Sequence, residues 1–252
     1  MNNKLKYRQL IIPKKGIHSY EVLYKETALF VSTPVDFSKK ILKNLISLRK
    51  PLEKYIEKNP EFLTSLKPIT SSKDAPEIVK KMIEVSKKTN TGPMSAVAGA
   101  IAEFLGFKIL KWLEKQNLRK FLIIENGGDI FTYVDEPISI GIYAGESSPF
   151  TGKLSIKINL LNQPIGICTS SGTVGHSLSF GKADAVTIIS NSSSFSDALA
   201  TATANLVKTE KDIETAIEFA KSFFETIFVC VIKNNKISFF SKVKEIEIIN
   251  KN

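Results

Sequence analysis

The sequence contains few of the side chains on which metal centres and covalent catalysis most often depend. Its 252 residues include only two cysteines and two histidines. Two cysteines cannot make the disulfide framework of a small secreted protein, so we interpret both as reduced thiols of a cytoplasmic protein. Two histidines exclude a histidine-rich metal site. The patterns GxGxxG, GxxxxGK[ST], HExxH, CxxC and GxSxG are also absent, and with them the commonest nucleotide-binding, zinc-protease and hydrolase motifs.

Arginine is scarce as well, although the chain is basic. The formal net charge is +10, yet there are only three arginines, and the lysines are mixed with glutamates along the chain. Arginine is the better reader of phosphates and bases, so we predict no nucleic-acid partner. The basic start is not followed by a long apolar run, and residues 94–113 are interrupted by Glu103, Lys108 and Lys111. We therefore predict neither a signal peptide nor a transmembrane helix, and no membrane partner.

The first third of the chain has the patterns of a hairpin followed by helices. Residues 20–33 alternate between apolar and polar, which is typical of paired strands. Residues 36–59 and 75–90 have apolar side chains at helical spacing, and Pro51 is expected to break the first of these helices in two. The intervening residues 59–76 are rich in proline and serine and are expected to form a loop.

Two later helices begin with small residues, and many strands lie between them. Residues 91–116 and 191–209 are the helical stretches, and the second is expected to start near Ser196 or Asp197. Small residues permit either tight packing against a sheet or close approach of a ligand to the helix start. The strand-like runs are residues 119–134, 138–145, 153–170, 183–190 and a hairpin within 225–249 that turns at 233–236. These patterns predict an α+β fold with helices packed on a large, mostly antiparallel sheet, in one domain over residues 1–252 that two closely packed subdomains would also fit.

Two short motifs have both a structural and a functional interpretation. Gly127 and Gly128, followed by Asp129, lie between β-branched runs, as in a tight hairpin turn. The same glycines would let the main chain contact a phosphate or ribose. Asp197 and Thr201 are four residues apart on an expected helix and share one face. They are either a helix-start aspartate and an ordinary threonine, or two oxygen ligands of a hard cation such as Mg²⁺.

Residues 166–184, GICTSSGTVGHSLSFGKAD, combine glycines and hydroxyls with one thiol and one imidazole. His176 lies in a polar surrounding, where it is either a structural residue or an acid, base or ligand contact. The neighbouring serines leave a Ser-His-Asp hydrolase as an alternative. Cys168 ends an apolar strand, so it is either a buried core residue or a reactive thiol that carries sulfur.

The order of these motifs resembles the ApbE flavin transferase family. GGDI is followed by a Thr-Ser-Ser-Gly strand end, then by a histidine, then by the DALAT helix. The stretches YKETALFVS, LRKPLEKYIEKNPEF, TGPMSAVAGAIAE, ENGGDI, SSGTVGHSLSFGKADAV and DALATATANLV resemble still more closely the cytosolic, ApbE-like relatives of these FAD:protein FMN transferases. The resemblance covers nearly the whole chain and implies an ApbE-type, T-fold-like α+β architecture.

The resemblance also implies a ligand and a set of site residues. ApbE proteins use FAD and Mg²⁺ and transfer FMN to a threonine of a target protein. Asp197 and Thr201 correspond to the Mg²⁺ ligands, and His176 corresponds to the histidine of the catalytic loop. The small-residue segment at 91–99 corresponds to the stretch that lends the metal a main-chain carbonyl. The residues that correspond to the flavin-nucleotide site are Gly127, Gly128, Asp129, Thr169, Ser170, Ser171 and Gly172.

Two functional hypotheses follow. The first is a cytoplasmic, Mg²⁺-dependent FAD-binding protein that acts as an FMN transferase, with a protein acceptor, or as an FAD pyrophosphatase. The sequence after His176 reads HSLSFGKAD, where ApbE members have an Asp-Pro and a Thr-Gly turn, so nucleotide binding is more firmly expected than transfer to a threonine. The second hypothesis is an accessory protein without transferase chemistry, which has a partner in sulfur assimilation or homocysteine formation of anaerobes and in which Cys168 gains interest.

Overall fold

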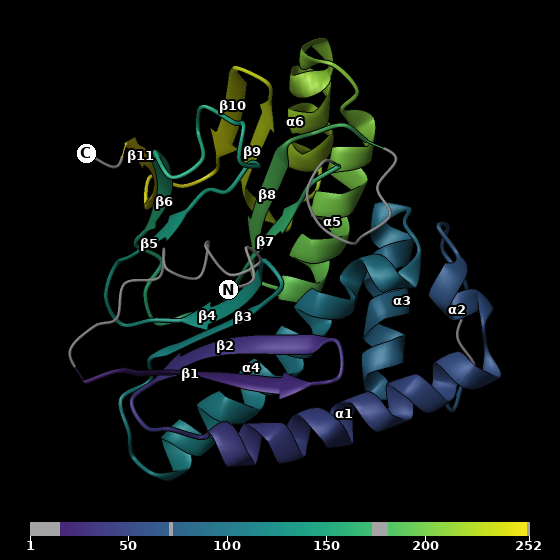
Figure 1. Ribbon diagram of the computed structural model, residues 1–252, viewed down its shortest axis with the longest axis vertical. Coiled ribbons are helices and arrows are strands. Elements are labelled where there is room, and N and C mark those ends of the chain that lie inside the picture. Colours follow the sequence, from purple (N-terminus) through teal and green to yellow (C-terminus); the bar gives the residue numbers. More distant parts are fainter. Residues whose placement is uncertain (1–15, 71–72, 173–180, 251–252) are drawn as a thin grey trace.

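A large antiparallel sheet and a smaller one make up the β-structure of the protein (Figure 1). The computed structural model describes residues 16–70, 73–172 and 181–250. Within these residues eight strands form the large sheet in the order β1-β2-β3-β4-β7-β8-β9-β10, and every neighbouring pair is antiparallel. The strands are β1 (His18–Tyr24), β2 (Thr27–Thr33), β3 (Leu122–Asn126), β4 (Asp129–Tyr133), β7 (Ile165–Ser170), β8 (Ala185–Ser190), β9 (Thr226–Lys233) and β10 (Lys236–Ser241). The predicted α+β class with a large antiparallel sheet is confirmed.

The second sheet and the helices pack on opposite faces of the large sheet, as Figure 1 shows. The second sheet has the order β11-β6-β5, with β5 (Ile138–Gly141), β6 (Leu154–Ile158) and β11 (Ile246–Asn250). The helices are α1 (Ser38–Lys58), α2 (Glu61–Thr64), α3 (Glu77–Thr89), α4 (Val97–Lys115), α5 (Ser193–Leu206) and α6 (Ile213–Lys221), with 3₁₀ helices η2 (Pro93–Ala96) and η3 (Glu210–Asp212).

The central strands of the large sheet are buried on both faces, and successive side chains of a strand point to opposite faces. In β3, Leu122 and Ile124 belong to the core beneath the helices, whereas Ile123 belongs to the core shared with the small sheet. In β8, Ile188 belongs to the core beneath the helices and Ile189 to the core shared with the small sheet. A strand that is buried on both sides needs apolar residues at every position, which explains the continuous runs LIIEN and AVTIIS.

The Gly-Gly motif is the turn of a two-residue hairpin. Asn126 pairs with Asp129 across β3 and β4, and the two residues between them are Gly127 (φ 67°) and Gly128 (φ 107°). Positive φ at both turn positions matches the right-handed twist of the strands and favours glycine. The hairpin interpretation of this motif is confirmed, and it places Asp129 at the first position of β4.

Two local predictions in the first third of the chain were wrong. Pro51 does not break α1, which runs through it without interruption. The buried residues Ile41, Leu45 and Leu52 form one stripe on both sides of the proline, and Arg49 forms an ion pair with Glu53 across it. Packing of this stripe outweighs the single backbone hydrogen bond that proline removes.

The expected loop at residues 59–76 contains the short helix α2. Its Phe62 side chain is fully buried and contacts the ring of Tyr55 of α1 edge to face. The loop was predicted from the many prolines and serines, and that composition does not show that one aromatic ring is buried.

The start of α5 and the end of the chain also differ from prediction. Helix α5 is capped by Ser192, whose side chain accepts a hydrogen bond from the N–H of Phe195, one turn before the expected Ser196 or Asp197. Asp197 therefore lies inside the helix and not at its cap. The predicted C-terminal hairpin is confirmed in β9 and β10, but the chain continues as β11, which joins the small sheet.

One helical stretch, Pro93–Lys115, is long and apolar enough to cross a membrane by length and composition. More than half of its apolar window (56%) is buried inside the protein, as expected of a core helix. It was the only such stretch found in the part of the chain that the structure describes.

The contact between β7 and α5 generates a stability prediction. A Cβ atom at Gly166 would lie 2.3 Å from Cα of Ser193 and 2.4 Å from its backbone nitrogen. Because the obstacle is backbone, we expect Gly166→Ala to lower the free energy of unfolding by at least about 3 kcal/mol, measured by urea denaturation. Gly152→Ala is the control, since nothing lies within 4 Å of its Cβ position and only its positive φ of 75° costs about 1 kcal/mol. Equal losses in the two variants would contradict the close approach.

Candidate functional site

The candidate site lies at one end of the large sheet, where the β3–β4 turn meets the end of β7. Asp129 pairs with Cys168, and Ser170 pairs with Val186 near the start of β8. The register therefore places the Gly127–Gly128 turn beside the hydroxyl-rich residues that leave β7. The structure brings together two of the three segments that the sequence analysis singled out.

The third segment joins them because α4 and α5 cross closely. The backbone N–H of Gly99 donates to Oδ2 of Asp197 over 2.8 Å. A Cβ at Gly99 would lie 2.3 Å from the carbonyl oxygen of Ser193 and 2.8 Å from Cβ of Asp197. Glycine at this position lets the start of α4 lie directly against α5, and the Asp197 carboxylate serves as a cap for α4.

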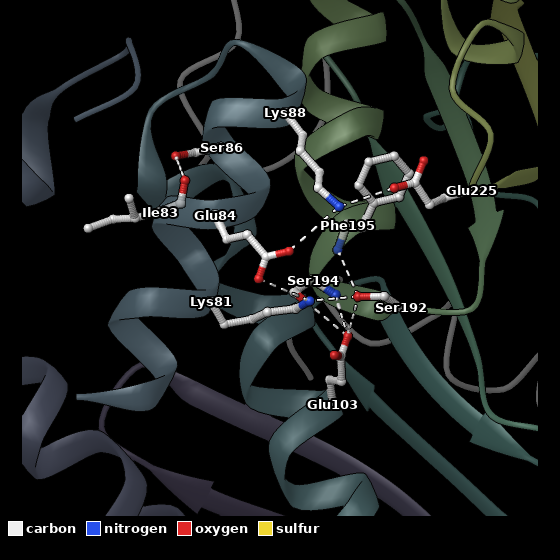
Figure 2. Close-up of polar contacts among 10 residues, drawn as sticks. All are labelled: Lys81, Ile83, Glu84, Ser86, Lys88, Glu103, Ser192, Ser194, Phe195 and Glu225. Carbon is white, nitrogen blue, oxygen red and sulfur yellow. Dashed lines mark hydrogen bonds and ion pairs between the residues drawn. The ribbon is translucent and has the colours of Figure 1, made fainter. Parts of the chain in front are cut away.

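Glu103 makes the reciprocal contact, which Figure 2 shows. Its Oε2 accepts hydrogen bonds from the hydroxyl of Ser192 (2.7 Å), the backbone N–H of Ser194 (2.9 Å) and the hydroxyl of Ser194 (3.0 Å). Each of the two helices thus supplies a carboxylate to the N-terminus of the other. Both carboxylates stabilise helix starts, where the peptide dipoles leave partial positive charge.

The β3–β4 turn is tied to the same helix start. The side-chain N–H of Asn126 donates to the carbonyl oxygen of Ala98 over 3.1 Å. At the base of the turn, the N–H of Gly128 donates to Oε1 of Glu125 over 2.7 Å. A Cβ at Gly127 would meet none of the described residues within 4 Å, so none of them covers this position of the turn. The turn is thus fixed in position while its backbone stays accessible.

Two buried carboxyl groups meet at this junction. Burial, with the nearby charge of Asp197, raises the pKa of Asp129 well above its usual range. Burial raises the pKa of Asp197 to about 7, although the N–H groups of Gly99 and Ala98 lower it in part. The strongest influences on either group, among the described residues, include no lysine or arginine. Neither carboxyl forms an ion pair within the part of the chain that the structure describes.

Cys168 is a buried core residue. Its side chain is fully buried and its thiol donates to the carbonyl oxygen of Ser193 over 3.2 Å. Burial and the neighbouring carboxyls of Asp129 and Asp197 raise the pKa of the Cys168 thiol well above its usual value. Since the thiolate is the reactive form, this position does not suit a nucleophile or a sulfur carrier.

The hydroxyl-rich residues after Cys168 are partly exposed. The hydroxyls of Thr169 and Thr187 lie 2.9 Å apart across β7 and β8. Ser170 and Ser171 are half-buried, and Gly172 is exposed, with its N–H donating to the carbonyl of Ala183. Thr169 is thus occupied in a cross-strand pair, while the next residues line the mouth of the site.

His176 lies outside the residues that the structure describes, so its predicted role is not tested. The residues on either side of that stretch are close together, since a Cβ at Gly172 would lie 2.0 Å from the carbonyl oxygen of Gly181. Gly181 in turn packs on Ala204, one turn of α5 beyond the half-buried Thr201. Of the residues that flank the stretch, Gly181 therefore lies against α5 and Gly172 lies against Gly181.

A solvent-open depression of about 470 Å³ lies near the start of β8. Its lining includes Gly145 and Glu146 before β6, Asp184 before β8, and Asn234 in the β9–β10 turn. Asp184 is held there by Lys233, 3.2 Å away, and by the N–H of Asn234. Neither Asp129 nor Asp197 lines this depression, so it lies apart from the junction of the two carboxyls.

Sequence reasoning assigned no role in this site to Glu103, and it included Gly99 and Asn126 only as members of the small-residue segment at 91–99 and of the ENGGDI motif. Gly99 and Glu103 lie four residues apart on α4, so they share one face. The sequence did contain one indication of this contact: Glu103 is a lone carboxylate in a stretch of small and apolar residues. A charge that is buried in such a stretch needs hydrogen-bonding partners. Glu103 was used only as an argument against a transmembrane helix.

The comparisons with known proteins agree with this architecture. A family model described as AbpE bacteria matches residues 9–223. The chain belongs to this ApbE-like family. A UPF0280 protein of Methanococcus vannielii is 43% identical over 215 residues, which cover 83% of this chain and 84% of that protein. A UPF0280 protein of Methanocaldococcus jannaschii is 39% identical over 231 residues, covering 89% and 91%.

Solved structures of flavin transferases share the fold. The apo form of the Pseudomonas stutzeri flavinyl transferase ApbE superposes with a TM-score of 0.56 and 13% identity, covering 89% of this chain and 94% of that one. The flavin transferase ApbE of Vibrio cholerae gives a TM-score of 0.54 and 12% identity, covering 89% and 96%. At these identities the likeness establishes the architecture, and the predicted ApbE-type fold is confirmed.

The Glu103 contact predicts a large effect at a residue without a catalytic role. Glu103→Ala leaves a buried N–H and two hydroxyls without their acceptor, so we expect a loss of about 3 kcal/mol in the free energy of unfolding. Glu103→Gln keeps an acceptor oxygen and should lose less. Glu114→Ala, at the exposed end of the same helix, is the control and should change stability little. If both alanine variants unfold at the same urea concentration, the proposed importance of this contact is wrong.

The raised carboxyl pKa values predict that the metal-free protein loses stability as the pH rises. A carboxyl with a folded pKa near 7 and an unfolded pKa of 3.8 favours folding in acid, and this contribution is lost between those values. The slope per group is at most about 1.4 kcal/mol per pH unit. Urea unfolding in EDTA from pH 4 to pH 8 measures it. Asp197→Asn should flatten the profile, and an unchanged slope would refute the assignment.

Proposed function

We propose that this protein is a Mg²⁺-dependent FAD-binding enzyme that cleaves the FAD pyrophosphate and passes FMN to an acceptor hydroxyl. The observation that carries the proposal is the buried Asp197 carboxylate of α5, held against the start of α4 beside an open Gly-Gly turn. The shared fold of the flavin transferases supports the ligand class. With water as the acceptor, the same chemistry would be FAD pyrophosphatase activity.

The donor set at α5 fits a hard divalent cation. Asp197 offers a carboxylate oxygen, and Thr201 offers a hydroxyl on the same helix face. The described residues contain no cluster of three or more His, Cys, Asp or Glu that would hold a metal alone. Mg²⁺ suits such a site, because it is usually bound by one or two carboxylates, with substrate phosphates and water completing the shell.

The β3–β4 turn and the end of β7 fit the flavin nucleotide. Gly127 and Gly128 expose backbone without side-chain bulk, and only the carbonyl of Thr169 comes within 4 Å of the Cβ position of Gly128. Ser170 and Ser171 would supply hydroxyls at the same mouth. Backbone N–H groups and hydroxyls are the usual uncharged partners of phosphate and ribose oxygens.

The proposed reaction needs charge neutralisation and a base. A bound divalent cation would neutralise charge on the pyrophosphate. His176 is the proposed base: it takes the proton as the acceptor oxygen bonds to the FMN phosphorus, while the bond from that phosphorus to the AMP oxygen breaks. The residues of α5 and the β3–β4 turn hold the nucleotide in line for this exchange.

The alternative of a sulfur-metabolism accessory protein receives no support from the thiol. Cys168 is fully buried and its pKa is raised, as required of a core residue and not of a carrier. The acceptor of the proposed transfer, and any partner protein, are matters for experiment.

Flavin fluorescence gives the test of this proposal. We expect FAD to bind the purified protein with Mg²⁺ and to bind at least about tenfold more weakly in EDTA or in Asp197→Asn. The asparagine keeps an acceptor for the Gly99 N–H, so the α4–α5 contact survives. Asp135→Asn, at an aspartate bound to Arg119 beyond the far end of β4, is the control. A folded wild-type protein that binds no FAD with or without Mg²⁺ would overturn the proposal.

A further inference from the structure

The most unusual group in the protein is the side chain of Asp129. It is 8% exposed, and its Oδ1 atom is buried without a hydrogen-bond partner among the described residues. A buried carboxylate oxygen that lacks a donor is costly, because nothing replaces the water it gave up. Among the buried side-chain atoms without such a partner, which also include Glu53 Oε1, Ser155 Oγ and Thr203 Oγ1, Oδ1 of Asp129 is the one that lies beside a second buried carboxyl.

The contacts around Asp129 lead directly to Asp197. Asp129 is the register partner of Cys168, whose thiol donates to the carbonyl of Ser193. The Ser193 hydroxyl donates to the carbonyl of Ile130, the residue after Asp129. Ser193 lies one turn before Asp197 on α5, and the charge of Asp197 acts on Asp129. Two carboxyl groups from different elements are thus neighbours in a buried place.

Among the described residues this pair has hydrogen-bond donors but no cationic partner. By contrast, Arg49 and Lys233 neutralise Glu53 and Asp184 elsewhere in the fold. No ion pair formed within the described chain involves Asp129 or Asp197. Oxygen ligands without a protein cation are the environment that hard divalent metals prefer.

We propose that Asp129 is a direct ligand of the divalent cation, so that the β3–β4 hairpin and α5 hold the metal between them. The inference rests on the proposed function and changes the role of one residue in it: Asp129 binds the metal and not the nucleotide. The ligand class is a small, oxygen-preferring cation, Mg²⁺ or Mn²⁺. Binding would supply the unpartnered Oδ1 with its missing partner and remove the repulsion between the two carboxylates.

The arrangement has a functional consequence. The metal ligands would come from two elements that meet only in the folded protein, and the hairpin also presents Gly127 and Gly128 to the nucleotide. One turn would therefore fix the metal and the phosphate relative to each other. Ligands that are fixed in this way would hold the cation in position already in the absence of the nucleotide.

The test is Mn²⁺ binding measured by electron paramagnetic resonance, without FAD and with FAD. We expect Asp129→Asn to weaken Mn²⁺ binding at least about tenfold in each state in which the wild type binds it. Asp135→Asn is the matched control and should bind Mn²⁺ like the wild type, because its side chain is bound to Arg119.

The other outcomes separate this inference from the proposed function. Unchanged Mn²⁺ affinity in Asp129→Asn, together with weaker FAD binding, would make Asp129 a nucleotide contact; it would overturn the inference and leave the proposed function intact. A folded wild type that binds no Mn²⁺ with or without FAD would overturn the inference and the metal dependence together. If Asp129→Asn fails to fold, Asp129→Glu is the second variant, and an unchanged Mn²⁺ affinity in folded Asp129→Glu would overturn the inference.

Discussion

The reciprocal capping of α4 and α5 is the interaction on which the candidate site depends. Asp197 of α5 accepts from the N–H of Gly99 at the start of α4, and Glu103 of α4 accepts from the start of α5. Each carboxylate satisfies backbone donors that a helix start leaves unpaired. The contact is possible only because Gly99 has no Cβ, which would collide with Ser193. The Asp197 carboxylate is thus held by the same bonds that hold the two helices together.

The sheet completes the site from the other side. The β3–β4 hairpin is tied to α4 through Asn126 and to α5 through the contacts of Ile130 and Cys168 with Ser193. Two helices and one hairpin therefore fix each other, and two carboxyl groups lie where they meet. Binding sites built on regular elements hold their ligands more rigidly than sites built on loops alone.

The sequence predicted the elements more accurately than their ends. The Gly127–Gly128 turn was predictable because two glycines between β-branched runs leave few other structures. The start of α5 was placed one turn late, because several serines and an aspartate in a row can each cap a helix. Pro51 was expected to break α1, and only the buried stripe of Ile41, Leu45 and Leu52 reveals why it does not.

The candidate site, too, could be predicted only in part. The residues Asp197, Thr201, Gly127 and Gly128 were identified from motif order, and the structure places Asp197 and the glycines at one junction. The burial of Cys168 was one of two alternatives that the sequence left open, whereas the burial of Asp129 and the bond from Glu103 to α5 could not be predicted. Burial and pKa depend on which distant segments surround a side chain, and one sequence does not specify those neighbours.

By itself, the sequence determined the α+β class, the antiparallel hairpins and the family, because these follow from local periodicity, turn chemistry and motif order. Only the tertiary structure decided that two carboxyl groups 68 residues apart in sequence, Asp129 and Asp197, act on each other in a buried place. The physical reason is that charges interact strongly only where water does not screen them. Such a buried place exists only when the whole chain is folded.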